Sequence, residues 1–148
     1  MLNPNRFGLS YACDKEVHPA PGNCTHCNMP LVKESSVIFK TVQPSEVCNY
    51  ISQNPKVILL DVRTNAEFEG RAEPNWGRLK NAINLPIQEL EARIATLAPY
   101  KDREIIVYCS VSRRSPRASY ILTQNGFKKV TNMARGMSVM RGNSCKVQ

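Results

Sequence analysis

Short apolar segments alternate with amphipathic segments along most of this 148-residue chain, and this alternation limits the possible folds more than any other feature. The apolar segments are rich in Val, Ile and Leu, which favours buried strands, whereas the segments between them have the spacing of helices. Strands that alternate with helices form a parallel sheet covered on both faces. We therefore predict an α/β domain with a five-stranded parallel sheet. The predicted strands are residues 36–39, 57–60, 82–85, 105–108 and 129–133.

Local signals mark the helices between these strands. Ser115 is a good N-cap residue and Pro116 a good first helical residue. Thr64 and Glu67 have the spacing of a capping box, which predicts a short helix from residue 64. Residues 70–80 are predicted to form a polar loop. The other predicted helices are residues 44–53, 87–97 and 116–126, with a helical turn after Gly136.

The stretch from Cys109 to Arg114 is the strongest indication of chemistry, because it links a predicted strand to a predicted helix. Ligands of parallel sheets bind beyond the carboxyl ends of the strands. A cysteine there faces backbone N–H groups and the positive end of a helix dipole, and Arg113, Arg114 and Arg117 add positive charge. Such surroundings favour the nucleophilic thiolate. The alternative is a buried thiol that packs as a small hydrophobe, but an apolar residue would then be expected after Cys109.

Several motifs in order across residues 36–142 resemble the rhodanese-like sulfurtransferase domain. They are Leu60-Asp61-Val62-Arg63, Glu67-Phe68, the segment 80–86, Val107-Tyr108-Cys109, Arg114-Ser115 and Gly136-Met137. The resemblance implies a rhodanese-like sheet flanked by helices and a persulfide on Cys109. It also implies a sulfurtransferase, since the cysteine loop has six residues and Arg114 closes it. Ser112 departs from the family, which often has a glycine at this position.

The implied reaction moves a sulfane sulfur from a thiosulfate- or persulfide-type donor through Cys109 to a nucleophilic acceptor. It is covalent catalysis in two half-reactions. We expect Arg114 to order the loop and offset negative charge, Arg113 to point outward and guide the donor anion, and Asp61 and Arg63 to make structural hydrogen bonds beside the loop. Backbone amides of the loop are expected to stabilise the persulfide as an anion-binding nest. The residues of this predicted substrate-binding loop are Ser110, Val111, Ser112, Arg113 and Ser115.

Two other functions stay open. The first is a sulfur carrier without turnover, or a protein-binding module, docked to its partner through the N-terminal segment. The second is a phosphatase or arsenate reductase with the same cysteine corner. A phosphatase-type loop would place its arginine at position 115, where this chain has Ser115. Activity with small thiosulfate-like donors separates an enzyme from a carrier.

Residues 1–35 differ in composition from the rest and hold three of the six cysteines. Their motifs, Tyr11-x-Cys13, Pro21-Gly22-x-Cys24-x-x-Cys27 and Met29-x-Leu31, resemble a small heavy-metal-binding module. Cys24 and Cys27 form one knuckle of a tetrahedral site, Cys13 is a third thiolate, and His18 is the expected fourth ligand. Three thiolates and one imidazole suit a structural zinc ion. The alternative is a reduced, metal-free segment.

Charge and hydropathy limit the expected partners. The net charge is +8, but the basic residues are scattered and aromatic residues are few, which favours small sulfur-containing anions over nucleic acid. An acceptor protein is a second expected partner. No apolar run approaches the ~20 residues of a membrane span. The N-terminus lacks the layout of a signal peptide, and the cysteine distribution indicates a metal site and individual thiols, so we expect a cytoplasmic protein.

The last residues, 143–148, are predicted to be a flexible tail. Cys145 lies in this tail, where a mobile thiol could resolve the Cys109 persulfide as a disulfide. The alternative is an idle tail cysteine. Cys48 is expected to lie buried between its helix and the sheet.

Overall fold

The computed structural model describes residues 38–111, 113–140 and 144–147, and also the backbone of three short strands nearer the N-terminus. These strands are β1 (Phe7–Gly8), β2 (Val17–His18) and β3 (Val32–Lys33), and they pair antiparallel in the order β2-β1-β3. The predicted metal ligands Cys13, Cys24 and Cys27, and the side chain of His18, lie outside the described residues.

The main sheet has five parallel strands in the order β4-β9-β8-β5-β7, which confirms the predicted α/β fold. Its first strand is found later than expected, at 40–42 instead of 36–39. Lys40 pairs with Thr131 of β9, whereas Ile38 lies outside the sheet and is 67% exposed. The strands are β4 (Lys40–Val42), β5 (Ile58–Asp61), β7 (Ile83–Asn84), β8 (Glu104–Tyr108) and β9 (Lys129–Met133).

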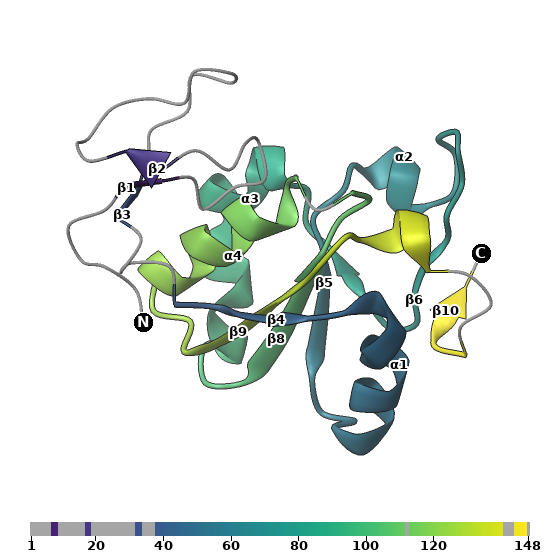
Figure 1. Cartoon of the computed structure of the whole chain (residues 1–148), viewed down its shortest axis with the longest axis horizontal. Helices are drawn as coiled ribbons and strands as arrows, with labels where there is room; N and C mark the ends of the chain where they lie inside the picture. The colour runs from purple at the N-terminus through teal and green to yellow at the C-terminus, as the bar shows by residue number, and fades with distance from the viewer. Residues whose placement is uncertain are drawn as a thin grey trace.

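Helices cover both faces of this sheet, as Figure 1 shows. One core packs the sheet against α3 and α4 through Leu90 and Leu122, and the other packs it against α1 through Val47. The helices are α1 (Pro44–Gln53), α2 (Asn65–Phe68), α3 (Ile87–Arg93) and α4 (Ser115–Gln124), with 3₁₀ segments η2 (Ile94–Tyr100) and η3 (Met137–Val139). Among the described residues, no helix has the length and hydrophobicity that a bilayer crossing requires.

The third predicted helix, 87–97, changes from α to 3₁₀ geometry after Arg93. Pro99 lies inside the 3₁₀ segment and has no backbone N–H, so it could not make the hydrogen bond of a continuing α-helix. The capping box predicted at Thr64 and Glu67 is present.

The C-terminal residues depart most from the sequence-based expectation. Strand β10 (Lys146–Val147) lies in the predicted flexible tail and pairs antiparallel with β6 (Arg78–Leu79), which lies in the predicted polar loop 70–80. Cys145 is joined to Cys48 by a disulfide, so the expectation of individual thiols is wrong for this pair. Neither two-residue strand is long enough to give a periodic signal, and the two cysteines lie 97 residues apart.

Candidate functional site

Cys109 directly follows β8, and α4 begins six residues later at Ser115. Its side chain is fully buried, and it is the free cysteine of the described part of the chain. The backbone N–H of Ser115 donates to the Cys109 Sγ at 3.4 Å, and the Ser115 Oγ lies at the same distance. The helix starts one residue earlier than predicted, with Arg114 as its N-cap. The sulfur therefore lies against the first turn of α4, where backbone N–H groups and the helix dipole favour an anion.

The 3₁₀ segment η3 supports the cysteine from another side. The backbone N–H of Met137 donates to the Cys109 carbonyl at 2.9 Å, and that of Ser138 donates to the Ser110 carbonyl at 3.0 Å. Gly136, which precedes this segment, has φ +72°, and a Cβ there would lie 2.5 Å from the Cys109 oxygen. Only a glycine permits this close approach, so Gly136 fixes the segment against the cysteine loop.

Arg114 closes the loop by binding Glu67 of α2. Its Nη1 donates to Glu67 Oε2 at 2.7 Å and its Nη2 to Oε1 at 2.9 Å, and the Ser110 hydroxyl also donates to Oε1 at 3.0 Å. The Thr64 backbone and hydroxyl donate to the same carboxylate from the capping box. The hydrogen bonds from Arg114 are the largest cause that lowers the pKa of Glu67, to about 2. Glu67 in turn is the main cause of the raised pKa of Arg114, to which Cys109 also contributes.

Sequence reasoning missed this role of Glu67, which it treated as a helix cap and as part of a family motif. A second signal was available. The short helix α2 follows β5, the strand beside β8, and the carboxyl ends of parallel neighbours meet at one edge of the sheet. A carboxylate in that helix is therefore within reach of an arginine in the loop that follows β8.

Asp61 and Arg63 form a buried ion pair beside the loop, with Arg63 Nη2 and Asp61 Oδ2 2.7 Å apart. The same Nη2 donates to the Gly77 carbonyl at 2.8 Å. Asp61 is the sheet partner of Tyr108, which directly precedes Cys109, and the Arg63 guanidinium lies 5.6 Å from the centre of the Tyr108 ring. Both side chains are essentially inaccessible, in agreement with the predicted structural hydrogen bonds.

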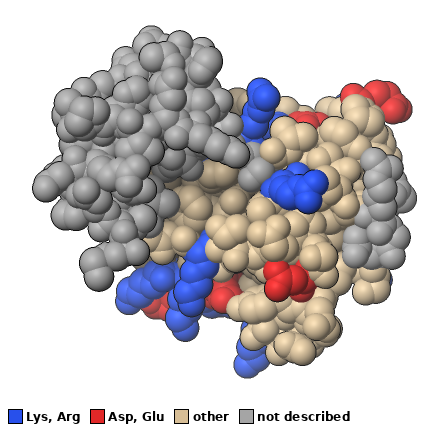
Figure 2. All heavy atoms as spheres, in the orientation of Figure 1, with Lys and Arg blue, Asp and Glu red and all other residues tan. Residues whose placement is uncertain are grey.

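The remaining predicted loop residues are divided between the interior and the surface. Ser110 and Ser115 are buried, Arg114 is half-buried, and Arg113 is exposed, as expected for a residue that points outward. Val111 is 49% exposed, and Ser112 lies outside the described residues. Figure 2 shows basic and acidic side chains interspersed over the viewed face, which agrees with the scattered charge in the sequence.

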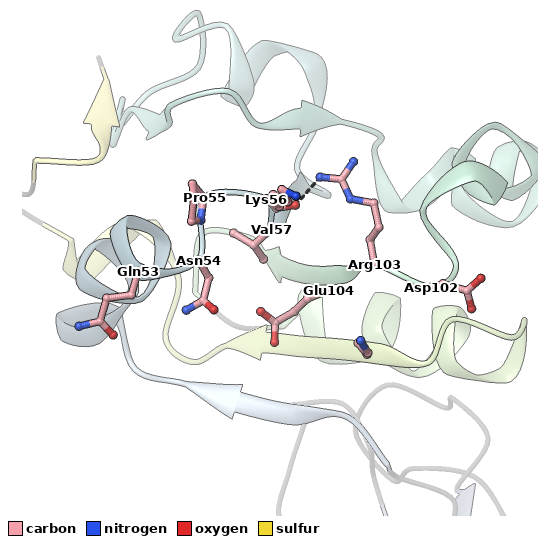
Figure 3. A pocket seen from close by; sticks show the side chains of 9 residues that line it. Gln53, Asn54, Pro55, Lys56, Val57, Asp102, Arg103 and Glu104 are labelled. Atoms are coloured by element: carbon pink, nitrogen blue, oxygen red, sulfur yellow. Dashed lines mark hydrogen bonds between the residues drawn. The ribbon is translucent and has the colours of Figure 1, made fainter.

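An open hollow of about 420 Å³ lies at the opposite end of the sheet (Figure 3). It is bordered by the turn after α1, by Arg103 and Glu104 at the start of β8, and by Lys129 at the start of β9. Glu104 accepts a hydrogen bond from the Tyr50 hydroxyl, and this contact raises the pKa of Tyr50 to about 12. Because Cys109 follows the other end of β8, this hollow does not belong to the cysteine site.

Within the described ranges, no group of three or more His, Cys, Asp and Glu side chains is arranged to hold a metal ion. The predicted zinc ligands lie outside those ranges, so the zinc site stays a prediction.

One family model matches a part of the chain that includes both most of the sheet and the cysteine loop. The family model described as the rhodanese-like domain matches residues 44–142. The chain belongs to the rhodanese-like domain family. The match includes β5, α2, β8 and the first turn of α4, and hence Cys109, Arg114 and Glu67. The predicted resemblance is thus confirmed at the level of the family.

Relatives of this rhodanese-like domain occur both alone and inside longer proteins. A rhodanese-related protein from Thermoplasma volcanium is 25% identical, with a TM-score of 0.56 over 69% of this chain and 90% of that protein. The Bacillus anthracis CoADR-RHD structure is 29% identical, with a TM-score of 0.57 over 69% of this chain and 16% of that protein. The tRNA uridine(34) hydroxylase of Cronobacter sakazakii is 27% identical over 108 residues, 70% of this chain but 29% of that protein. The chain thus spans under a third of this curated relative.

Proposed function

We propose that this rhodanese-like domain is a sulfurtransferase in which Cys109 carries the transferred sulfur. The observation that carries the proposal is the position of its Sγ, buried at the end of β8 and 3.4 Å from the first backbone N–H of α4. An anionic sulfur is stabilised there by the helix dipole and by the charge of Arg114. The six-residue loop ends at Arg114, which Glu67 holds in place.

The first half-reaction uses a small anion such as thiosulfate. The Cys109 thiolate attacks the outer sulfur of the donor, an S–S bond forms to Cys109, and the S–S bond of the donor breaks. The electron pair of the broken bond leaves with sulfite. The product on the protein is a persulfide anion, which takes the place of the thiolate at the first turn of α4. Arg113 is exposed beside the loop and guides the donor anion by its charge.

The second half-reaction returns the cysteine to its starting state. A nucleophile such as cyanide or a thiolate attacks the outer sulfur, and the electron pair of the persulfide S–S bond returns to the Cys109 Sγ. A thiol on a protein partner can serve as the acceptor in the same way. The relative from Cronobacter sakazakii is named for a tRNA modification, but this chain covers only 29% of it. We therefore base the proposed reaction on the geometry of Cys109 and not on the name of that relative. We place the protein in the cytoplasm.

Mass spectrometry after incubation with thiosulfate tests the proposal. The peptide that contains Cys109 should gain about 32 Da, one sulfur atom, and the Cys109→Ser protein should gain nothing at that peptide. Steady-state rates with thiosulfate and cyanide should follow ping-pong kinetics. A protein that loads sulfur without turnover would instead be a carrier docked to its partner. Transferase activity that persists in Cys109→Ser, or hydrolysis of an aryl phosphate that depends on Cys109, would overturn the sulfurtransferase proposal.

A further inference from the structure

The disulfide between Cys48 and Cys145 links α1 to the residue just before β10, across 97 positions of the chain. We propose that this pair is a reversible thiol–disulfide exchange site that controls how firmly the Cys109 loop is supported. In the oxidised state it holds β10 against β6. In the reduced state β10 separates from β6, and the contacts from β6 to the active-site strand weaken.

Among the described residues, the contacts that residues 144–147 make besides the disulfide are few. Next to the bond itself, the Cys145 backbone N–H donates to the Cys48 Sγ at 3.2 Å. The Cys145 carbonyl accepts a hydrogen bond from the Lys80 backbone N–H at 2.8 Å, and β10 pairs with β6 over only two residues. The Lys146 amine donates to the Met140 carbonyl at 2.7 Å. None of residues 144–147 is buried. Because an isolated two-stranded ladder is at best marginally stable in water, the disulfide is the strongest attachment of this segment.

Strand β6 connects this segment to the cysteine. Its Leu79 backbone N–H donates to the Tyr108 hydroxyl at 3.1 Å, and Tyr108 directly precedes Cys109. The residue before β6, Gly77, accepts from Arg63 at 2.8 Å. A Cβ on Gly77 would lie 2.3 Å from the Val147 carbonyl oxygen, so β10 is in direct contact with the same residue. Leu79 and Gly77 therefore both lose a neighbour when β10 separates. Leu79 holds the Tyr108 hydroxyl, and Gly77 holds Arg63.

Accessibility separates this pair from the catalytic thiol. Cys48 and Cys145 are both partly exposed, whereas Cys109 is fully buried. A small dithiol can therefore reach the disulfide: one thiolate attacks one sulfur and releases the other cysteine, and the second thiolate then breaks the mixed disulfide. Both cysteines become thiols while the dithiol is oxidised to a cyclic disulfide. A low-molecular-weight disulfide reverses the change.

Amide hydrogen exchange of the whole chain tests the structural half of this proposal. Reduction with dithiothreitol should accelerate exchange at Leu79 and Lys80 by about tenfold or more, as local opening requires. Oxidised glutathione should restore the slow exchange. Cys145→Ser should exchange fast at the same two amides and should not respond to reductant. Cys48→Ala provides a second variant with the same expectation. Equal protection of Leu79 and Lys80 in both redox states would overturn the proposal.

Two further measurements connect the switch to the cysteine. Alkylation and peptide mapping in glutathione buffers should find Cys48 and Cys145 mostly reduced at the high thiol-to-disulfide ratios typical of a cytosol. A pair that stays oxidised there is a permanent structural bond, and the switch is refuted. Sulfur loading of Cys109 should be severalfold slower in Cys145→Ser than in the oxidised protein, and unchanged loading would refute the coupling. The exchange and peptide-mapping measurements do not depend on sulfur transfer by Cys109. A failure of the proposed sulfurtransferase function can therefore be distinguished from a failure of the switch.

Discussion

The carboxylate of Glu67 receives both Nη atoms of Arg114, at 2.7 and 2.9 Å, although the two residues lie 47 positions apart. The pair is only partly exposed, at 27% for Arg114 and 23% for Glu67. A two-point contact of this kind fixes the plane of the guanidinium as well as its position. Glu67 therefore keeps the charge of Arg114 beside Cys109, and it also binds the Ser110 hydroxyl within the same loop.

Replacement of Glu67 by Gln should slow sulfur transfer about tenfold or more, because the bidentate charged contact to Arg114 is lost. The free energy of unfolding should fall by about 1–3 kcal/mol. The rate at which iodoacetamide alkylates Cys109 can be measured at several pH values in both proteins. If Glu67 acts through the charge of Arg114, the pH dependence of this rate should differ between Glu67→Gln and the natural protein.

Glu69→Gln is the matched control for this substitution. Glu69 lies two residues away and pairs with Arg71, but the two side chains are 52% and 63% exposed. Its removal should change the unfolding free energy by about 0.5 kcal/mol or less and leave the transfer rate intact. If Glu67→Gln behaves like Glu69→Gln, the contact to Arg114 does not position the loop.

Acid should weaken the same contact. The pKa of Glu67 is lowered from its usual 4.5 to about 2 in the folded protein. A lowered pKa means that the ionised form stabilises the fold, so this contribution is complete above pH 4.5 and disappears as the pH falls towards 2. Its upper limit is about 3 kcal/mol, which solvent screening at a partly exposed site reduces.

Urea unfolding at several pH values measures this effect. The stability difference between the natural protein and Glu67→Gln should shrink steadily as the pH is lowered from about 5 to about 2.5. The other carboxylates titrate in both proteins and cancel in the difference. A difference that does not change with pH would show that the charge of Glu67 contributes nothing to the fold.

Elements with complete local signals were predicted closely from the sequence. Strand β9 was predicted with its observed bounds, and so was α1, which has Pro44 at its first position and an apolar face with Val47. Cys109 was placed at the strand–helix corner for the same reason, because an apolar run precedes it and the helix-start signal of Pro116 follows it. In each case the information lies within about ten consecutive residues.

Features that depend on distant partners could not be found in this way. The pairing of Arg78–Leu79 with Lys146–Val147 and the Cys48–Cys145 bond have no local pattern, since each depends on the path of the whole chain. The first strand of the sheet was predicted too early in the chain, because the apolar residues before Lys40 resemble a strand. The hydrogen-bonding register with β9 determines where pairing begins, at Lys40.

The N-terminal segment should contain zinc. Protein purified without chelator should hold about one zinc ion per chain if Cys13, Cys24, Cys27 and His18 are the four ligands of a structural site, as the sequence predicts. Cys24→Ser should lose the metal, and Cys145→Ser is the control that should retain it. Elemental analysis of the purified proteins checks this. A natural protein without metal, or zinc retained in Cys24→Ser, would contradict the predicted ligand set.

Gly136 should be far more sensitive to a methyl group than Gly126. Both have positive φ, +72° and +88°, so alanine strains the backbone at either position. At Gly126 the one described atom close to the added Cβ is the Lys101 amine nitrogen at 3.7 Å, and the expected cost is about 1–2 kcal/mol. At Gly136 it would lie 2.5 Å from the Cys109 carbonyl oxygen and from the Ser110 backbone, which must move.

Gly136→Ala should therefore lower the unfolding free energy by about 3 kcal/mol or more and slow sulfur loading of Cys109 about tenfold in the molecules that remain folded. Gly126→Ala should load sulfur at the natural rate, because its methyl group does not reach the cysteine loop. Thermal unfolding gives the folded fraction of each variant, and mass spectrometry of the Cys109 peptide gives its loading rate. Equal loading rates per folded molecule in the two variants would show that Gly136 and η3 do not set the position of Cys109.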